Sequence, residues 1–331
     1  MAFEPQTALA AASRPRQLDW GNIGARYGTL VAALVIFLAF ALASDRFLSV
    51  NNISNILVQI SVLMIVSSGL TFAVASGEFD LSVGQVASLS GVLVAGLMIW
   101  SELPVALAIL LAILAGLALG LVNGLLVTRL RIPSLIATLA MGPIALGINY
   151  AYTNGDSIYA SMPPGFYYIA TGRIGIVPVP VVIALVIVAT FYVLLNKTRL
   201  GRGVVATGAN IQAARLSGIA VNRCRLIALS LSGLGAAMGG VMLTARLGTG
   251  QSGAGDAYLL DSLTAVFLGM TVFKPGRATV QGTLVGVVII GMLDNGLNLL
   301  GAPFYLQNEV RGLVMIAAVS LAVLRSEIRF F

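Results

Sequence analysis

The chain has 331 residues, of which 58% are hydrophobic and only 9% are charged, and its formal net charge is +7. This apolar share exceeds the roughly 45–50% of a soluble domain, so the composition indicates a polytopic membrane protein. The absence of histidine excludes histidine-based metal sites and histidine general bases from this sequence, and the single cysteine, Cys224, excludes an internal disulfide.

The first residues, 1–26, are polar and are predicted to form a cytoplasmic N-terminal tail. The first apolar span follows at 27–43. Its last residues, Ala41, Leu42 and Ala43, resemble a signal-peptide cleavage site, so a secretory signal is the alternative interpretation. The polar leader, 1–26, is long for the n-region of a signal peptide, which favours a retained first span.

Nine further apolar stretches are long enough to be membrane spans. They cover residues 54–75, 83–99, 104–128, 133–153, 178–196, 226–246, 258–273, 279–299 and 308–324. Together with the first, they predict an all-α polytopic membrane domain, 27–325, with about ten transmembrane helices. A short cytoplasmic C-terminal tail, 326–331, follows.

Lysine and arginine are distributed unevenly between the two sides of this map. With both termini in the cytoplasm, 15 of the 19 lie on the inner side, and the remaining four are Arg46, Arg173, Arg246 and Arg311. Because positive residues gather on the cytoplasmic side of membrane proteins, we expect both termini there. Membrane topology therefore explains the net charge, and no nucleic-acid partner is needed.

A polar turn, residues 76–84, separates the second and third spans. Its carboxylates, Glu78 and Asp80, are costly if buried in lipid, so each is expected to lie at an interface, to be paired, or to face a wet cavity. Ser82 is expected to cap the next helix. A capping turn with no further role is the alternative interpretation. Further along, the aromatic outer loop, 154–177, is either an interfacial belt or a landing surface for a partner.

The segment 197–225, which we call the coupling segment, is the long polar stretch between two later spans and carries six basic residues without an acidic one. Within it, residues 209–216 predict a short helix that Gly218 ends in the C′ position. Gly201, Gly203 and Gly208 predict a bent approach to this helix. So short a helix is expected to lie on the membrane surface or to dock into a partner.

Two motifs resemble those of a known family. Gln212, Ala213 and Ala214, with Gly218 after three more residues, resemble the EAA-x3-G loop of permeases in ATP-binding-cassette importers. The surrounding TRLGRGVVATGAN and the turn 76–84 are similar to the ribose and simple-sugar branch, whose turn reads GGxDLSVG. Gln212 replaces an acidic residue of the family, and Glu78 and Phe79 replace its commoner pair of small apolar residues. The resemblance extends from about residue 47 to 324.

The resemblance implies a multi-pass permease of a bacterial inner membrane. This permease would import a pentose, a hexose or a related polyol, together with a second permease subunit, a cytoplasmic ATPase that holds ATP and Mg, and a periplasmic sugar-binding protein. The residues that it assigns to ATPase coupling are Gln212, Ala213, Ala214, Arg215 and Gly218. Those that it assigns to the signature turn are Gly77, Asp80, Leu81, Ser82 and Gly84.

The sequence also bears on the energy source. Neither Lys197 nor Lys274 follows a glycine, so the chain lacks a phosphate-binding loop. We expect it to carry no catalytic residue for ATP hydrolysis and to bind no cofactor of its own. A gradient-driven secondary transporter of a small polar solute remains the alternative. An intramembrane enzyme would require Asp80, Asp261 and Asp294 to lie close together.

Polar residues within the later spans suggest partners and a path. Asp261 and Asp294 are expected either to pair with Arg246 or Arg311 or to lie at the interface, and 248–255 is expected to be a glycine-rich outer turn. Asn123-Gly124 and Asn295-Gly296 lie five spans apart, which suggests an inverted repeat of two five-helix halves. The candidates for lining a sugar path are Asn123, Asn149, Tyr150, Asn295 and Asn298.

Overall fold

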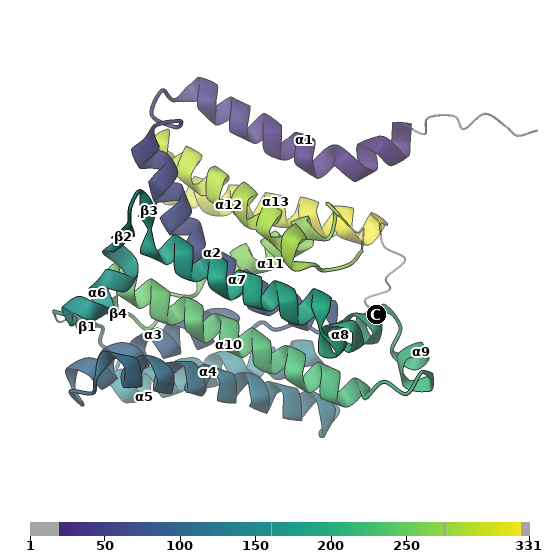
Figure 1. Cartoon of the computed structure of the whole chain (residues 1–331), viewed down its shortest axis with the longest axis horizontal. Coiled ribbons are helices and arrows are strands. Elements are labelled where there is room, and N and C mark those ends of the chain that lie inside the picture. Colours follow the sequence, from purple (N-terminus) through teal and green to yellow (C-terminus); the bar gives the residue numbers. More distant parts are fainter. Residues whose placement is uncertain (1–19, 160, 274–275, 326–331) are drawn as a thin grey trace, which may run out of the picture.

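The computed structural model describes residues 20–159, 161–273 and 276–325, and it describes side chains from residue 28 to 322 within these ranges. Residues 1–19 of the predicted N-terminal tail and all of the predicted C-terminal tail lie outside them. The long helices run side by side (Figure 1). Their bounds are α1 Trp20–Ala43, α2 Val50–Ala75, α3 Val83–Ile99, α4 Val105–Thr128, α5 Ser134–Thr153, α7 Val179–Lys197, α10 Val221–Leu247, α11 Ala257–Gly269, α12 Val280–Leu299 and α13 Phe304–Arg325.

A helix lies at the position of every predicted span. Among the described residues, six helices (α2, α4, α5, α7, α10 and α12) are long and apolar enough to cross a membrane. Shorter apolar helices cover 28–43, 83–99 and 257–269. The all-α polytopic class is therefore confirmed. The eighth predicted span is too long, because α11 ends at Gly269 rather than at residue 273.

The centre of the bundle is the pair α2 and α10. Gly69 of α2 faces Gly235 of α10 so closely that a Cβ on Gly69 would lie 2.8 Å from the Cα of Gly235. Gly235 therefore serves helix packing, since only a residue without a side chain allows this approach. Outside this pair, α10 also packs against α4 and α3, and α2 packs against α12, α7 and α11.

The remaining helices form two similar groups around this centre. Helix α3 packs against α4 and α5 on one side, and α11 packs against α12 and α13 on the other. The first helix, α1, lies against α12, where Phe40 of α1 lies over Gly296. The hydroxyls of Thr29 and Thr271 also lie 2.5 Å apart. Helix α1 thus packs on the bundle.

The outer loop contains more structure than the sequence indicates. It forms β1 (Ile158–Tyr159), α6 (Pro164–Thr171), β2 (Arg173–Ile174) and β3 (Val177–Pro178). Strands β2 and β3 pair with each other, and β1 pairs antiparallel with β4 (Thr249–Gly250), with Ile158 opposite Gly250. These strands and α6 lie at one end of the molecule, and the short helices α8 (Arg199–Ala209) and α9 (Ile211–Leu216) lie at the other (Figure 1).

The glycine-rich segment after α10 was predicted to be an outer turn, and this prediction is wrong. Residues 248–256 run back along α3 instead. Gly250 packs against Ala95 near the end of α3, whereas the amide N–H of Gly255 donates a hydrogen bond to the Ser88 hydroxyl, with an N···O distance of 2.9 Å. Glycine permits this course because a side chain on Gly255 would collide with the carbonyl oxygen of Gly84.

Candidate functional site

The predicted coupling helix is present as α9, Ile211–Leu216. The side-chain oxygen of Asn210 caps it by accepting hydrogen bonds from the amides of Gln212 and Ala213, at 3.0 and 2.9 Å. Gly218 has φ +77° and follows the C-cap Ser217. The helix is two residues shorter at its start than predicted, and Gly218 is confirmed as its C′ residue.

The side chains of α9 divide into a buried and an exposed set. Ala214 is 4% exposed, so it is the member of the predicted coupling set that packs against the rest of the chain. Gln212, Ala213, Arg215 and Gly218 are exposed. Leu216 is 91% exposed, although it is apolar. The sequence motif did not identify Leu216, because the face that a six-residue helix presents depends on how its neighbours hold it.

The approach to α9 is a second helix, α8, Arg199–Ala209, and not the predicted bend. Thr198 caps it by accepting a hydrogen bond from the amide of Gly201. Its glycines are nevertheless sites of close contact. A Cβ on Gly203 would lie 2.9 Å from the sulfur of Cys224, and one on Gly208 would collide with the carbonyl oxygen of Ala75. Because Ala75 ends α2, α8 packs directly on the start of the signature turn.

The signature turn is held together by a small polar network. The Asp80 carboxylate accepts hydrogen bonds from the amide and the hydroxyl of Ser82, at 3.0 and 2.6 Å. The Ser82 hydroxyl in turn accepts one from the side-chain amide of Asn123 on α4, at 3.0 Å. The expectation that the Ser82 side chain caps α3 is therefore wrong, since its hydroxyl is used to join Asp80 to Asn123.

Both carboxylates of the turn are buried, and each is accommodated in a different way. Glu78, 6% exposed, forms an ion pair with Arg225 of α10, which confirms that it is paired. Asp80 is fully buried, and burial raises the pKa of its carboxyl above the ordinary value, opposed by the hydrogen bonds from Ser82. Its second oxygen, Oδ2, has no hydrogen-bond partner among the described residues.

Backbone contacts fix the turn to α5 as well. The amide of Phe79 donates a hydrogen bond to the hydroxyl of Ser134, and the amide of Leu81 donates one to the hydroxyl of Thr138, at 3.1 and 3.0 Å. Gly77, with φ +82°, permits the reversal that starts the turn. The turn thus contacts α4, α5, α8 and α10, although it is only a few residues long.

The five candidate path residues are placed in separate surroundings. Asn123 belongs to the signature-turn network, and Asn295 exchanges hydrogen bonds with Asn52 of α2 at 2.9 and 3.0 Å. Asn149 donates to the carbonyl of Ser252 at 3.2 Å, which ties α5 to segment 248–256. Asn298 accepts from Gln307, and Tyr150 is 48% exposed on α5. No hydrogen bond between described residues joins one candidate to another.

A further polar pair was not anticipated from the sequence. The side-chain amide of Gln85 on α3 donates a 2.7 Å hydrogen bond to the carboxylate of Asp256, which is exposed. The pair lies close to Gly142 of α5, where a Cβ would be 3.7 Å from the Gln85 side chain. A carboxylate and an amide among apolar helices are the signal that could have identified them. The pair was not expected because an outer turn at 248–255 would not bring Asp256 to α3.

The intramembrane carboxylates share one arginine. The Arg311 Nε of α13 lies 2.9 Å from an Asp294 oxygen of α12 and 3.6 Å from an Asp261 oxygen of α11. Arg311 is confirmed as the partner, and both carboxylates are buried at 6% exposure. Because Asp80 is engaged in the separate network of Ser82 and Asn123, the three aspartates do not form the single cluster that an intramembrane hydrolase would need.

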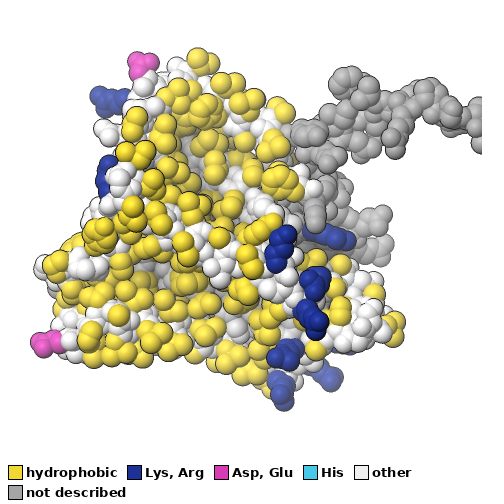
Figure 2. Space-filling view, viewed as in Figure 1, with side chains coloured by type: hydrophobic (Ala, Val, Ile, Leu, Met, Phe, Trp, Pro, Cys, Tyr) yellow, Lys and Arg dark blue, Asp and Glu magenta, His cyan; other side chains and the backbone are white. Residues whose placement is uncertain are grey.

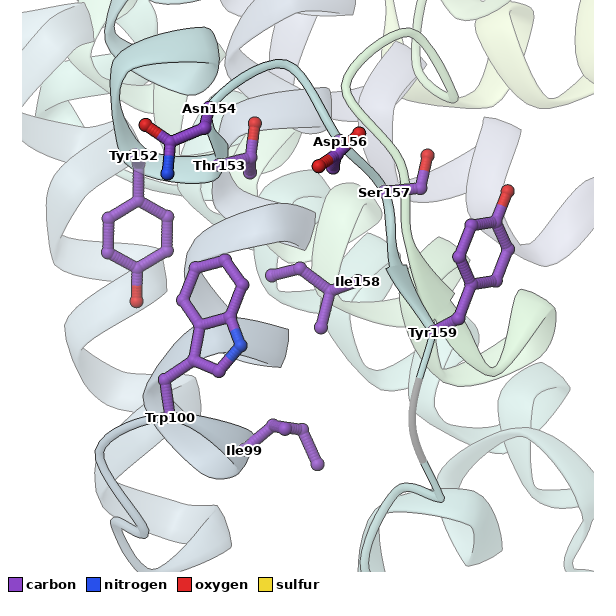
Figure 3. A pocket seen from close by; sticks show the side chains of 9 residues that line it. All are labelled: Ile99, Trp100, Tyr152, Thr153, Asn154, Asp156, Ser157, Ile158 and Tyr159. Carbon is purple, nitrogen blue, oxygen red and sulfur yellow. The ribbon is translucent and has the colours of Figure 1, made fainter.

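A cavity of about 500 Å³ opens at the end of the molecule that carries the strands, between the ends of α3 and α5 and strand β1. Its wall is aromatic, and the Trp100 ring lies between Tyr152 and Ile158 (Figure 3). The Trp100 and Tyr152 ring centroids are 5.2 Å apart. Asp156 and Ser157 add polar groups above these rings. Aromatic faces beside hydrogen-bonding groups can hold a sugar ring, or they can anchor this edge in the membrane interface.

Comparison with known proteins relates the chain to a family of permeases. The family model described as "Branched-chain amino acid transport system / permease component" matches residues 52–319. The ribose import permease protein of Bacillus subtilis (strain 168) is 40% identical over 307 residues, which are 92% of this chain and 95% of that protein. The L-arabinose transport system permease protein of Escherichia coli (strain K12) is 35% identical over 301 residues, 91% of each chain. The D-allose transport system permease protein of the same strain is 34% identical over 311 residues, 94% of this chain and 95% of its own. No solved structure matches the chain.

Proposed function

The chain belongs to the family of transport-system permease components that includes the ribose import permeases, and from this we propose that it forms the membrane path of a sugar importer. It is a permease of an ATP-binding-cassette system, and in such systems a separate subunit hydrolyses ATP. This membership favours a permease over the gradient-driven carrier. The substrate that we propose is a monosaccharide, since the relatives are named for ribose, D-allose and L-arabinose.

The complete transporter that we propose contains two permease subunits, a cytoplasmic ATPase and a periplasmic sugar-binding protein. Two permease subunits cross the membrane, each with ten helices and with both termini in the cytoplasm. A cytoplasmic ATPase contacts α9, and a periplasmic sugar-binding protein contacts the outer end, where α6 and the strands lie. The bacterial inner membrane is the site of such a complex. The two similar helix groups around α2 and α10 support an inverted repeat, which is a common basis for alternating access.

The observation that carries the coupling proposal is the exposure of α9. Gln212, Ala213 and Leu216 are exposed on a capped helix, and Leu216 presents an almost entirely accessible apolar side chain. An apolar side chain that projects from a polar segment is suited to a pocket on a partner. We therefore assign Leu216 as an anchor for the ATPase, beside the motif residues.

Movement of α9 has a direct route to the membrane helices. Gly208 of α8 lies against the end of α2, and Arg225 of α10 holds Glu78 of the signature turn. From there the network of Asp80, Ser82 and Asn123 reaches α4. The close contacts leave little room for α8 to move independently, so a push on α9 shifts the turn as a unit. This assigns a mechanical role to the signature turn.

The sugar path that we propose follows segment 248–256. Gln85 and Asp256 offer an amide and a carboxylate to sugar hydroxyls. Asn149 and Tyr150 are neighbours on α5, which lies beside this segment because Asn149 contacts Ser252. Asn123, Asn149, Asn295 and Asn298 are already engaged with other groups of the chain, so we give them a supporting role. A neutral polyol needs such hydrogen bonds, held weakly enough for release.

The test is to change the exposed apolar side chain of α9 without disturbing its fold. Leu216→Asp is expected to reduce co-purification of the ATPase by about tenfold, because a desolvated charge replaces an apolar anchor, and to reduce ATP-driven sugar uptake in vesicles to match. Leu130→Asp is the matched control, since Leu130 is also exposed, at 66%, in the inner connection between α4 and α5. Normal co-purification and uptake with Leu216→Asp would refute the role of α9.

A further inference from the structure

A groove lies at the inner end of the molecule, between α8 and the start of α10, and its volume is about 670 Å³. Its floor is apolar and includes Ala206, Ile219 and Ile227. Its polar lining consists of the guanidinium groups of Arg199, Arg202 and Arg223, and no aspartate or glutamate lines it. None of these three arginines forms an ion pair with a carboxylate that the structure describes. The groove thus combines three free positive charges with an apolar base.

The backbone adds to the positive character of this groove. Both α8 and α10 begin at it, and a helix start carries partial positive charge and amide groups that lack partners within the helix. The start of α8 is capped by Thr198, whereas no side chain caps the start of α10 at Ala220. The three arginines and the two helix starts are therefore all positive, so the ligand that matches this groove is an anion.

The position of the groove indicates which class of anion binds there. Figure 2 shows lysine and arginine gathered at the inner end of a face that is otherwise largely hydrophobic, over the region of α8 and the start of α10. Positive charge next to an apolar surface at this end matches the level of lipid headgroups. A soluble anion would use the arginines and leave the apolar floor uncovered. A phospholipid would use both, with its phosphate at the arginines and its glycerol and upper acyl chain on the floor.

We propose that the groove between α8 and α10 is a binding site for one anionic phospholipid of the inner leaflet. The lipid lies beside the coupling segment and contacts α8, whose other end holds the signature turn. This site is independent of the identity of the transported sugar, and its test does not depend on transport.

The experiment measures lipid retention by the purified full-length chain. Native mass spectrometry in detergent compares phosphatidylglycerol with phosphatidylcholine, each added at the same concentration. The wild-type chain is expected to retain phosphatidylglycerol in preference. Arg202→Gln with Arg223→Gln is expected to lower this retention by about tenfold, since each arginine near an anionic lipid contributes to binding. The matched control, Arg129→Gln with Arg131→Gln, removes two exposed inner arginines outside the groove and is expected to leave retention within about twofold.

A second variant tests the floor without changing any charge. Ala206→Phe fills the groove and is expected to reduce retention of phosphatidylglycerol as well, because the glycerol and acyl region loses its place. Equal losses in the groove and control arginine variants would overturn the proposal in favour of diffuse charge. So would full retention in Ala206→Phe. Loss of ATPase co-purification with unchanged lipid retention in the groove variant would assign the groove to the protein partner instead, and would also overturn it.

Discussion

At the residue scale, buried polar groups are paired in ways that the sequence only partly indicates. Glu78 and Arg225 are 147 positions apart, and Asn52 and Asn295 are 243 apart, yet each pair is in contact. An unpaired polar group in an apolar interior costs free energy, so each partner keeps the other in place. These long-range pairs connect helices that the chain order separates.

The first prediction concerns Asp80, which uses one of its two carboxylate oxygens. Asn can accept the same two hydrogen bonds from Ser82 through its single side-chain oxygen, so Asp80→Asn is expected to fold and to transport nearly normally. Asp80→Ala leaves the buried donors of Ser82 without an acceptor and is expected to lose about 1–3 kcal/mol of stability. Thermal unfolding of the detergent-solubilised chain measures both. Equal destabilisation by Asn and Ala would show that the negative charge itself is required.

The second prediction concerns Arg311, which neutralises two carboxylates. Arg311→Gln leaves Asp261 and Asp294 buried without a cation and is expected to destabilise the chain by about 3–5 kcal/mol. The free energy of unfolding of the purified chain is the measurement. Combining Arg311→Gln with Asp261→Asn and Asp294→Asn removes the uncompensated charges, so this triple variant is expected to recover most of the loss. If Arg311→Gln alone were as stable as the wild type, the role of the ion pair would be contradicted.

At the element scale, glycine sets how closely helices and turns approach. Gly69 and Gly235 bring α2 and α10 together, and Gly208 brings α8 onto the end of α2. Helix α8 forms despite three glycines, which on local propensity alone disfavour a helix. Its contacts with α2, α7 and α10 compensate, because tertiary packing supplies most of the stability of short helices.

The third prediction tests this contact with one methyl group. Gly208→Ala places a Cβ against the carbonyl oxygen of Ala75 and is expected to displace α8 from the signature turn. Sugar uptake is expected to fall severalfold, whereas ATPase co-purification, which we propose to depend on α9, is expected to be retained. Gly312→Ala is the matched control, because Gly312 is also within a helix and has open space around its Cα. It is expected to leave uptake unchanged. Equal uptake in both variants would argue against transmission through α8.

At the scale of the whole molecule, charge and exposure distinguish the two ends. Basic side chains gather where α8 and α9 lie, and α6 and the strands form the opposite end (Figures 1 and 2). Because positive residues favour the cytoplasmic side, we assign the end with α9 to the cytoplasm. The same assignment places the aromatic cavity near Trp100 on the outer side.

The fourth prediction tests this orientation by cysteine labelling. Cys224→Ser provides a cysteine-free background, since the chain has only one cysteine. Asp156→Cys in this background is expected to react with a membrane-impermeant maleimide on intact spheroplasts, because Asp156 is exposed in the outer loop. Gln212→Cys, exposed on α9, is expected to react only after the membrane is permeabilised. The reverse labelling pattern would invert the topology.

The sequence by itself determined the parts that depend on local composition. Every span predicted from apolar length lies on a helix, and Gly218 follows the end of α9 as predicted. The start of the predicted short helix differs from that of α9 by two residues. The coupling and signature motifs led to the family, which the comparisons confirm. These features depend on residues close together in the chain, so pattern and spacing are sufficient to predict them.

Only the tertiary structure decided which residues meet. It joined Ser82 to Asn123 rather than to a helix start, laid segment 248–256 along α3, and exposed Leu216 while burying Ala214. It also brought Gln85 to Asp256, 171 positions away. In an apolar bundle, nearly every face of every helix has a similar apolar sequence, so the sequence does not show which faces pack together. The partner of a polar side chain depends on this packing, which is set by many weak contacts along the whole chain.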